Sequence, residues 1–354
     1  FFFKQKTAYE ISTRDWSSDV CSSDLAQNIL DRRMKNQDSV PVGSFTQCLR
    51  DELVSSEVRI QVAEGIERFR SEVERHQTKQ RYAQWLARAD QYTSDQNLES
   101  LLELYVTRIL LVRDESKRQL SLDLTLTEEE LEDRDSSQVR GAAELFMHEE
   151  LGIPYYFGFD RLCVMASGNV EELLGLAAAL YVGLQAKQVL RKSEPILSPL
   201  EQDKLLREAA ARKRDFIPKS HTEGTRAQRL LDSIGAFCYD QTFAPSAPYA
   251  PGVTGVRLSR AELAKLIAPG AFGPPGLALQ RVLAECAAEN LLVQRESQAT
   301  GSRDSGTVFY LNRSLCAHYG LPLQMGGWRD VTAGELMKWM ERRLTPSRKR
   351  VEAS

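Results

Sequence analysis

Apolar residues recur every three or four positions over most of the chain, which is the spacing of one face of an α-helix. Charged and apolar residues alternate over 44–115 with few breakers, and we expect two or three long helices there. The most apolar block, 140–190, predicts a helix over 141–151 that ends at Gly152 and a longer helix that begins after Asn169. The pattern therefore predicts a mainly α fold.

One segment departs from the helical period. Four leucines alternate with polar residues there, at Leu120, Leu122, Leu124 and Leu126, and this is the period of a half-buried strand. The acidic stretch 127–138 follows, and it is too polar to belong to a core.

Pairs of residues three positions apart mark several expected helix starts. In a capping box, a Ser or Thr side chain accepts from a backbone N–H three residues on, and a Glu or Gln there returns the bond. The pairs are Thr127–Glu130, Asn169–Glu172, Thr225–Gln228, Ser259–Glu262 and Thr332–Glu335. Ser198-Pro199-Leu200-Glu201 predicts another start, because proline suits the first helical position.

The pattern changes after a linker expected around 218–224. Three amphipathic helices follow, separated by loops rich in proline and glycine. The strings LLVQRE and TVFYLNR then flank a Gly/Ser/Asp turn and predict a β-hairpin. Three helices plus a β-hairpin is the order of a winged helix, a variant of the helix-turn-helix, and stacking these elements buries one small core.

The first 25 residues differ in character from the rest. Asp19 to Leu25 back-translates into a common sequencing-adapter oligonucleotide, and Lys4 to Ile11 resembles its companion. A signal peptide is the alternative, but Lys4 and Lys6 interrupt its apolar region and no basic stretch precedes it. We therefore expect 1–25 to be adapter-derived and disordered, and the natural start to lie upstream.

Composition and charge narrow the class of protein. The chain has 354 residues, of which 42% are apolar and 27% charged, and this excludes a disordered or collagen-like chain. The longest apolar stretch, Leu173 to Leu184, is too short to span a membrane. Residues 191–354 carry a net charge of +7 and residues 1–190 carry −10, which gives the overall −3. The basic half is the better candidate for a polyanion, although a solvated surface explains the charge equally well.

Candidate chemistry is sparse. Five cysteines lie outside 1–25, and neither they nor the histidines have metal-ligand spacing, so we expect reduced core cysteines in a cytoplasmic protein and no metal site. No phosphate loop, dinucleotide fingerprint, zinc-protease motif or nucleophile elbow occurs in the sequence. Asp114 and Glu115 follow an apolar run that Arg113 interrupts, so we interpret them as a helix end. No catalytic residue is expected.

Two strings nevertheless resemble a known family. GIPYYFGFDRLCVMASGNVEELLGLAAAL, residues 152–180, resembles the lid region of bacterial AAA ATPases of the origin-recognition and replication-initiator group. VFYLNRSLCAHYGLPLQMGGW, residues 308–328, is similar to the C-terminal winged helix of the same proteins. In that family a turn of small residues opens a lid helix near the nucleotide, and an arginine after the turn contacts the γ-phosphate. Here Val170, Glu171 and Glu172 follow the turn.

The resemblance implies two sets of site residues. The nucleotide-lid candidates are Ser167, Gly168 and Asn169. For DNA, the third helix of the winged helix would enter a groove and the wing would contact phosphates. The DNA-binding candidates are Gln280 and Arg281 on that helix, Arg295 and Arg303 on the wing, Arg212, Lys213 and Arg214 in a basic run, and Arg348, Lys349 and Arg350 in the tail.

The resemblance also implies a domain plan. It consists of a long-helix region (26–115), a helical lid-like domain (116–217), a winged-helix domain (225–340) and a basic tail (341–354). The chain is then interpreted as a C-terminal fragment of a DNA-associated AAA ATPase that binds DNA largely through phosphates and self-associates in the intact parent.

The expected activity follows from the missing phosphate loop. Without its backbone amides and lysine the chain is predicted to be inactive alone and to need no cofactor, whereas the intact parent would bind ATP and Mg²⁺ through the missing ATPase core. One alternative stays open at this stage. It is a non-catalytic regulatory or scaffold protein whose winged helix docks a protein partner.

Overall fold

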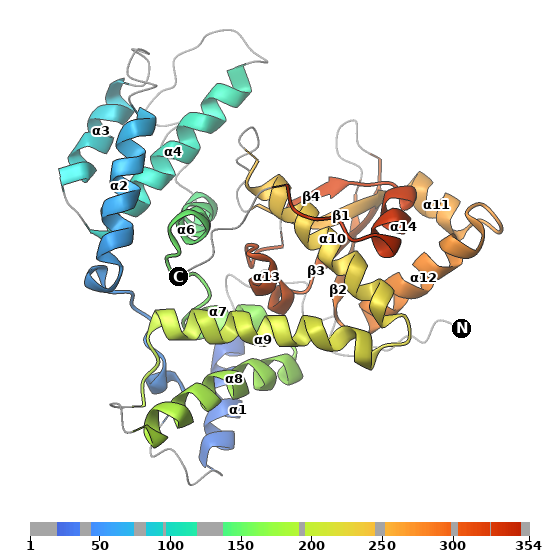
Figure 1. The fold of residues 1–354 in the computed structure, drawn as a ribbon, viewed down its shortest axis with the longest axis horizontal. Coiled ribbons are helices and arrows are strands. Elements are labelled where there is room, and N and C mark those ends of the chain that lie inside the picture. The colour runs from blue at the N-terminus through green and yellow to red at the C-terminus, as the bar shows by residue number, and fades with distance from the viewer. Residues whose placement is uncertain are drawn as a thin grey trace. The chain divides into compact units, whose positions relative to one another are not determined.

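The fold is mainly helical, as the sequence predicts (Figure 1). It is taken from a computed structural model, which describes residues 20–35, 44–73, 83–94, 97–118, 137–190, 195–244, 252–298, 304–325 and 327–347. The predicted strand at 120–126, the capping pair Thr127–Glu130, Arg303 and the basic tail from 348 lie outside these residues.

The chain forms two compact units, and each combines segments that are far apart in the sequence. Unit 1 contains 1–52 and 156–209, and unit 2 contains 53–155 and 210–354. This grouping differs from the consecutive regions that the resemblance implies, because the helices of 137–151 and 159–166 belong to different units.

Unit 1 is helical. Its helices are α1 (Val20–Lys35), α7 (Phe159–Ala166), α8 (Val170–Val189) and the first part of α9 (Pro199–Ser220), with the short helix η2 (Thr46–Cys48) before a parallel bridge between Leu49 and Leu197. Helix α1 begins inside the segment expected to be disordered, so the last six residues of that segment, 20–25, are helical.

Three polar side chains hold the turn that leads into α7. The Asp203 carboxylate accepts from the Tyr156 N–H (2.8 Å), the Gln202 amide oxygen from the Gly158 N–H (2.9 Å), and the Asp51 carboxylate from the Phe159 N–H (3.1 Å). Gly158 has a φ of +84°, which a residue with a Cβ rarely adopts. The turn is therefore fixed by hydrogen bonds to distant parts of the same unit.

The first part of unit 2 is a cluster of helices around one hydrophobic core. They are η3 (Ser55–Val58), α2 (Arg59–Val73), α3 (Ala83–Ser94), α4 (Leu98–Arg118) and α6 (Ser137–Leu151). Ile109, Leu110 and Leu111 of the ILLVRDE string are buried in α4, so the interpretation of that string as helix is confirmed.

The second part of unit 2 contains the three predicted helices and the predicted hairpin. In chain order the elements are α10 (Gly224–Thr242), β1 (Val253–Ser259), α11 (Arg260–Ile267), α12 (Gly273–Ala288), β2 (Leu292–Ser297), β3 (Gly306–Leu311), α13 (Arg313–Tyr319), β4 (Gly327–Asp330) and α14 (Ala333–Glu341). The sheet order is β2-β3-β1-β4, with β3 antiparallel to β2 and β1, and β4 parallel to β1. Helix α14 contacts α10 and α12 (Figure 1).

Several details differ from the sequence-based expectation. The expected Pro/Gly-rich loop ends in β1, a buried strand of the sheet, and the string after the hairpin forms α13. The expected linker is shorter, because α9 continues through Pro218 to Ser220. These elements are short, and tertiary pairing decides their conformation more than local pattern does.

Most of the predicted helix starts have the expected cap. Asn169 accepts from the backbone N–H groups of Glu171 and Glu172, and Thr332 forms a full capping box with Glu335. Further predicted starts are confirmed at Ser198 and Ser259.

The Thr225–Gln228 cap is wrong, because α10 begins at Gly224 and its N-cap position is Glu223, two residues before Thr225. The Glu285 carboxylate of α12 instead accepts from the N–H groups of Thr222 (2.7 Å) and Glu223 (2.9 Å) before α10. This cap is a tertiary contact.

The described cysteines are free thiols in the core, as predicted, at Cys48, Cys163, Cys238, Cys286 and Cys316. Among the described residues, no helix has the length and apolar character required to cross a membrane. No group of His, Cys, Asp or Glu within the described ranges has the arrangement of a metal site.

Candidate nucleic-acid interface

Two of the DNA-binding candidates lie on the third helix, α12, and each contacts another element of unit 2. The Gln280 side chain donates from Nε2 to the carbonyl of Leu266 (2.5 Å), which ties α12 to α11. Arg281 forms an ion pair with Glu223 (Nε to Oε1, 3.0 Å). Both side chains therefore make contacts within unit 2, while the Arg281 side chain is still 64% exposed, and DNA binding by this pair stays a prediction.

The exposed surface of α11 and α12 contains apolar side chains beside the charged Lys265 and Arg281. The Ile267 side chain at the end of α11 is 69% exposed and Leu277 near the start of α12 is 58% exposed, while Ala284 and Ala288 continue the exposed face of α12. Base edges in the major groove are read by hydrogen-bond donors and acceptors, with few apolar contacts. This face suits a protein surface better than a base edge.

Arg214, from the basic run on α9, is also used inside the protein. Its guanidinium forms two hydrogen bonds to the buried Asp232 carboxylate of α10, one of them from Nε at 2.9 Å. Tyr319 (2.9 Å) donates to the same carboxylate, and Arg343 pairs with it (3.3 Å). Burial and the neighbouring Asp232 charge raise the pKa of Tyr319 well above its ordinary value. Arg214 therefore holds α9 against α10.

The other two residues of that run lie differently. Arg212 is exposed on α9. The Lys213 ammonium donates to the Ser314 hydroxyl at the start of α13 (3.0 Å), and that hydroxyl donates to the Asn312 side-chain oxygen (2.8 Å). A lysine from α9 is thus part of a polar chain that ends at α13.

Arg295 and Arg313 form the unpaired part of the interface. Arg295 is exposed on the edge strand β2, and Arg313 is the first residue of α13. Neither makes a hydrogen bond or an ion pair with the residues that the structure describes. Burial lowers the pKa of Arg313, and the positive charge of the neighbouring Arg295 lowers it further. Two guanidinium groups, one on β2 and one on α13, are therefore left without a carboxylate partner among the described residues.

Sequence reasoning found Arg295 but missed Arg313. The helix α13 was not expected, and Arg313 stood in the string interpreted as the second hairpin strand. The role of Arg313 depends on its burial by distant parts of the chain, and no local sequence pattern predicts such burial. Arg257 was likewise unassigned, but it is buried and neutralised, with Asp330 at 2.5 Å and the Trp328 ring below its guanidinium.

The nucleotide-lid candidates in unit 1 lie in one tight turn before α8. Ser167 and Gly168 both have positive φ, 52° and 72°, and the Ser167 hydroxyl is buried without a hydrogen-bond partner among the described residues. Asn169 caps α8, and the first helical turn carries Glu171 and Glu172. Two carboxylates there repel a phosphate, so the charge at this turn is unfavourable for a nucleotide, and the lid role of these residues stays a prediction.

Comparison with known protein families gives the class of this protein. It is an AAA-type, replication-initiator-like protein, because the matching family model, ORC-CDC6-like, covers residues 6–329. The chain therefore belongs to the ORC-CDC6-like family. The match begins inside the segment 1–25, and the adapter origin of that segment and the bacterial origin of the chain stay predictions. No curated protein and no solved structure matches the chain.

Proposed function

We propose that this chain binds duplex DNA through its phosphates, independently of base sequence, as the DNA-associated part of an AAA-type replication initiator. The observation that carries the proposal is the pair of arginines without a carboxylate partner among the described residues, Arg295, which is exposed on the edge strand β2, and Arg313 at the start of α13. Phosphates are the usual ligands of arginines at a winged-helix wing, and such contacts give affinity without base preference.

The arrangement favours the wing over the third helix. Because Gln280 and Arg281 are engaged within the protein, α12 offers little to a base edge. The winged-helix part would then contact the DNA backbone through β2 and α13, and we expect Arg303 to add a further charge. Arg212 on α9 adds an exposed charge to the same basic half of the chain.

Two exposed arginines provide a matched test of this arrangement. We expect Arg295→Ala to weaken binding to a short duplex about tenfold, because one charge-assisted phosphate contact is lost. Arg281→Ala removes the same charge but should change affinity by less than about twofold. Fluorescence anisotropy of a labelled duplex measures both. If Arg281→Ala weakens binding more than Arg295→Ala does, α12 contacts the DNA bases or backbone, and the proposal is contradicted.

Catalysis is assigned to the intact parent. The sequence contains no phosphate loop, so we infer that this chain does not hydrolyse ATP and that an ATPase core supplied elsewhere binds ATP and Mg²⁺. Genomic DNA upstream of Ala26 tests this inference. An in-frame phosphate loop would support it, and continuous coding sequence without such a loop would favour the scaffold alternative.

The apolar face of α11 and α12 supports protein docking as a second candidate function. Ile267 and Leu277 are exposed apolar side chains of the kind found at protein interfaces. Ile267→Asp with Leu277→Asp should leave duplex affinity unchanged if the wing binds DNA. If this double variant instead loses DNA binding while keeping its thermal stability, the wing is not the DNA contact.

A further inference from the structure

Two consecutive residues at the junction of β3 and α13 have buried donors without acceptors. Asn312 is fully buried, and neither its side-chain nitrogen Nδ2 nor the Nε of Arg313 has a hydrogen-bond partner among the described residues. Buried polar groups in proteins are almost always hydrogen-bonded, and an unsatisfied one costs about 1–3 kcal/mol. Two adjacent donors are thus left without a protein acceptor in the part of the chain that the structure describes.

The orientation of Asn312 is fixed by its other contacts. Its side-chain oxygen accepts from the backbone N–H of Ser314 (2.9 Å) and from the Ser314 hydroxyl (2.8 Å). Because a backbone N–H can only donate, the atom that it meets must be the oxygen. The amide nitrogen is thus left as a donor, and Lys213 strengthens this arrangement through its bond to the same hydroxyl.

Arg313 differs from the other inward-facing arginines of unit 2. Arg108 pairs with Glu150, Arg214 with Asp232, and Arg257 with Asp330. Arg313 has no carboxylate partner in the part of the chain that the structure describes, and the charge that it meets is that of Arg295. A partly buried cation without a counterion is destabilising by itself, so its presence indicates a negatively charged ligand.

We propose that Asn312 and Arg313 form a phosphate-binding site, with Arg295 at its rim and Lys213 supporting it through Ser314. The site offers hydrogen-bond donors and positive charge, which match a tetrahedral dianion and exclude a metal cation. A guanidinium also binds phosphate oxygens in a bidentate geometry. The proposal deepens the proposed function, because the phosphate can come from the DNA backbone, but a free phosphate ion has the same chemistry.

The first arm of the test measures thermal unfolding of the full chain in inorganic phosphate and in chloride at matched ionic strength. We expect phosphate to raise the Tm of the wild type by about 2–4 °C through binding to the folded state. Arg313→Met should remove this shift. In chloride the variant should be at least as stable as the wild type, because it removes an uncompensated buried charge.

A structural arginine would behave in the opposite way. If Arg313→Met lowers the Tm in chloride and phosphate has no effect on the wild type, the site is wrong. A full phosphate shift retained in Arg313→Met would also overturn it. Arg281→Met, which removes an exposed and paired charge from α12, is the matched control, and it should keep the shift. Arg295→Ala should reduce the shift without affecting folding, since its side chain is exposed.

The second arm measures duplex affinity and separates the two sources of phosphate. If the site holds a DNA phosphate, Arg313→Met should weaken duplex binding about tenfold. If it holds free phosphate, duplex affinity should be unchanged while the thermal shift is lost, and the site is supported for that source. If the wild type shows the thermal shift in phosphate but does not bind DNA, the proposed function is wrong and the proposed phosphate site is still supported.

Discussion

Glu150 shows how a largely buried carboxylate is stabilised by neighbouring donors in this protein. Its carboxylate accepts from Arg108 Nη1 (2.7 Å), the Tyr105 hydroxyl (3.0 Å) and Arg68 (3.4 Å), which connects α2, α4 and α6. The guanidinium of Arg108 also lies over the Tyr105 ring. Burial alone would raise the pKa of Glu150, but these hydrogen bonds hold it below its ordinary value. The network therefore stabilises the fold while Glu150 is ionised.

This predicts a pH-dependent effect of Glu150→Gln. Because the folded-state pKa is below the ordinary value near 4.5, the stabilisation is complete at neutral pH and is lost as the pH falls through the folded-state pKa. We expect the variant to lose about 2 kcal/mol of unfolding free energy at pH 7 and less at pH 4. Urea denaturation at both pH values measures this loss.

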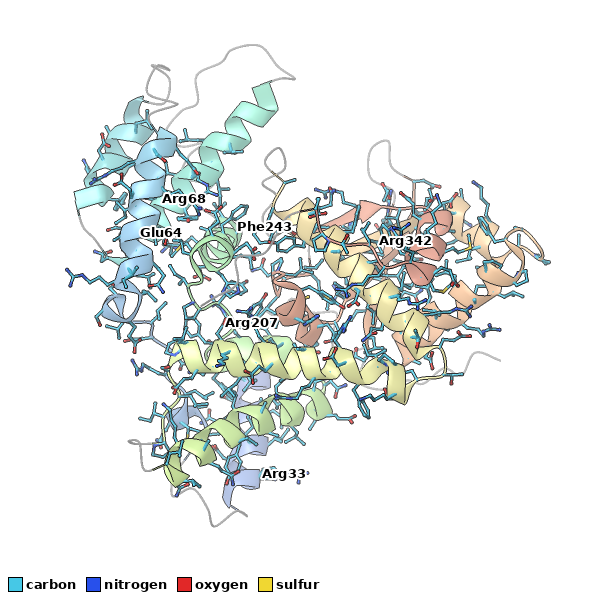
Figure 2. The ribbon with its side chains drawn as sticks, in the orientation of Figure 1. Arg33, Glu64, Arg68, Arg207, Phe243 and Arg342 are labelled. Carbon is cyan, nitrogen blue, oxygen red and sulfur yellow. The ribbon has the colours of Figure 1, made fainter. Side chains whose placement is uncertain are left out.

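Glu64→Gln is the control for this prediction. Glu64 is an exposed carboxylate on the same helix as Arg68 (Figure 2), and its replacement should change stability by less than about 0.5 kcal/mol. A loss in Glu150→Gln that is as large at pH 4 as at pH 7 would show that the ionised network does not contribute.

Elements with a sustained apolar face were predictable, and elements fixed by partners were not. The helices α10, α11 and α12 and the β2–β3 hairpin follow from periodicity, because each buries a repeating set of residues. Strand β1 contains Gly255 and the buried Arg257, so its sequence lacks the apolar alternation of a strand, and α13 is only 7 residues long. In the candidate site, Arg295 could be predicted because it lies in the hairpin that periodicity predicts. The hydrogen bond from Gln280 to the Leu266 carbonyl could not be predicted, because it joins two different helices.

Replacing two helical glycines by alanine should change the stability of the protein in opposite directions. A Cβ at Gly235 in α10 would lie 2.4 Å from the buried Tyr319 ring of α13, whereas a Cβ at Gly175 in α8 meets nothing within 4 Å. Gly235→Ala should therefore destabilise the fold by about 1–3 kcal/mol through overpacking. Gly175→Ala should stabilise it by about 0.5–1 kcal/mol through helix propensity. Thermal melts of both variants measure this, and equal shifts would show that α10 and α13 do not pack as described.

At the scale of the whole molecule, unit 2 joins a helical cluster to the proposed DNA-binding part. Phe243 at the end of α10 (labelled in Figure 2) packs edge-on against Phe146 of α6, and their ring centroids are 5.1 Å apart. The Tyr239 hydroxyl of α10 donates to the Glu149 carboxylate of α6. The family match spans both units, so replication-initiator-like character belongs to the chain as a whole, while Arg295 and Arg313 both lie in the second part of unit 2.

The salt dependence of duplex binding tests the central claim most directly. Each phosphate contact contributes about −0.9 to the slope of log K against log salt concentration. The account predicts steep salt dependence for the wild type and a slope that is shallower by about two units for the Arg295→Ala, Arg303→Ala double variant. A wild-type affinity that does not change with salt, or a double variant with the wild-type slope and affinity, would contradict phosphate-led DNA binding.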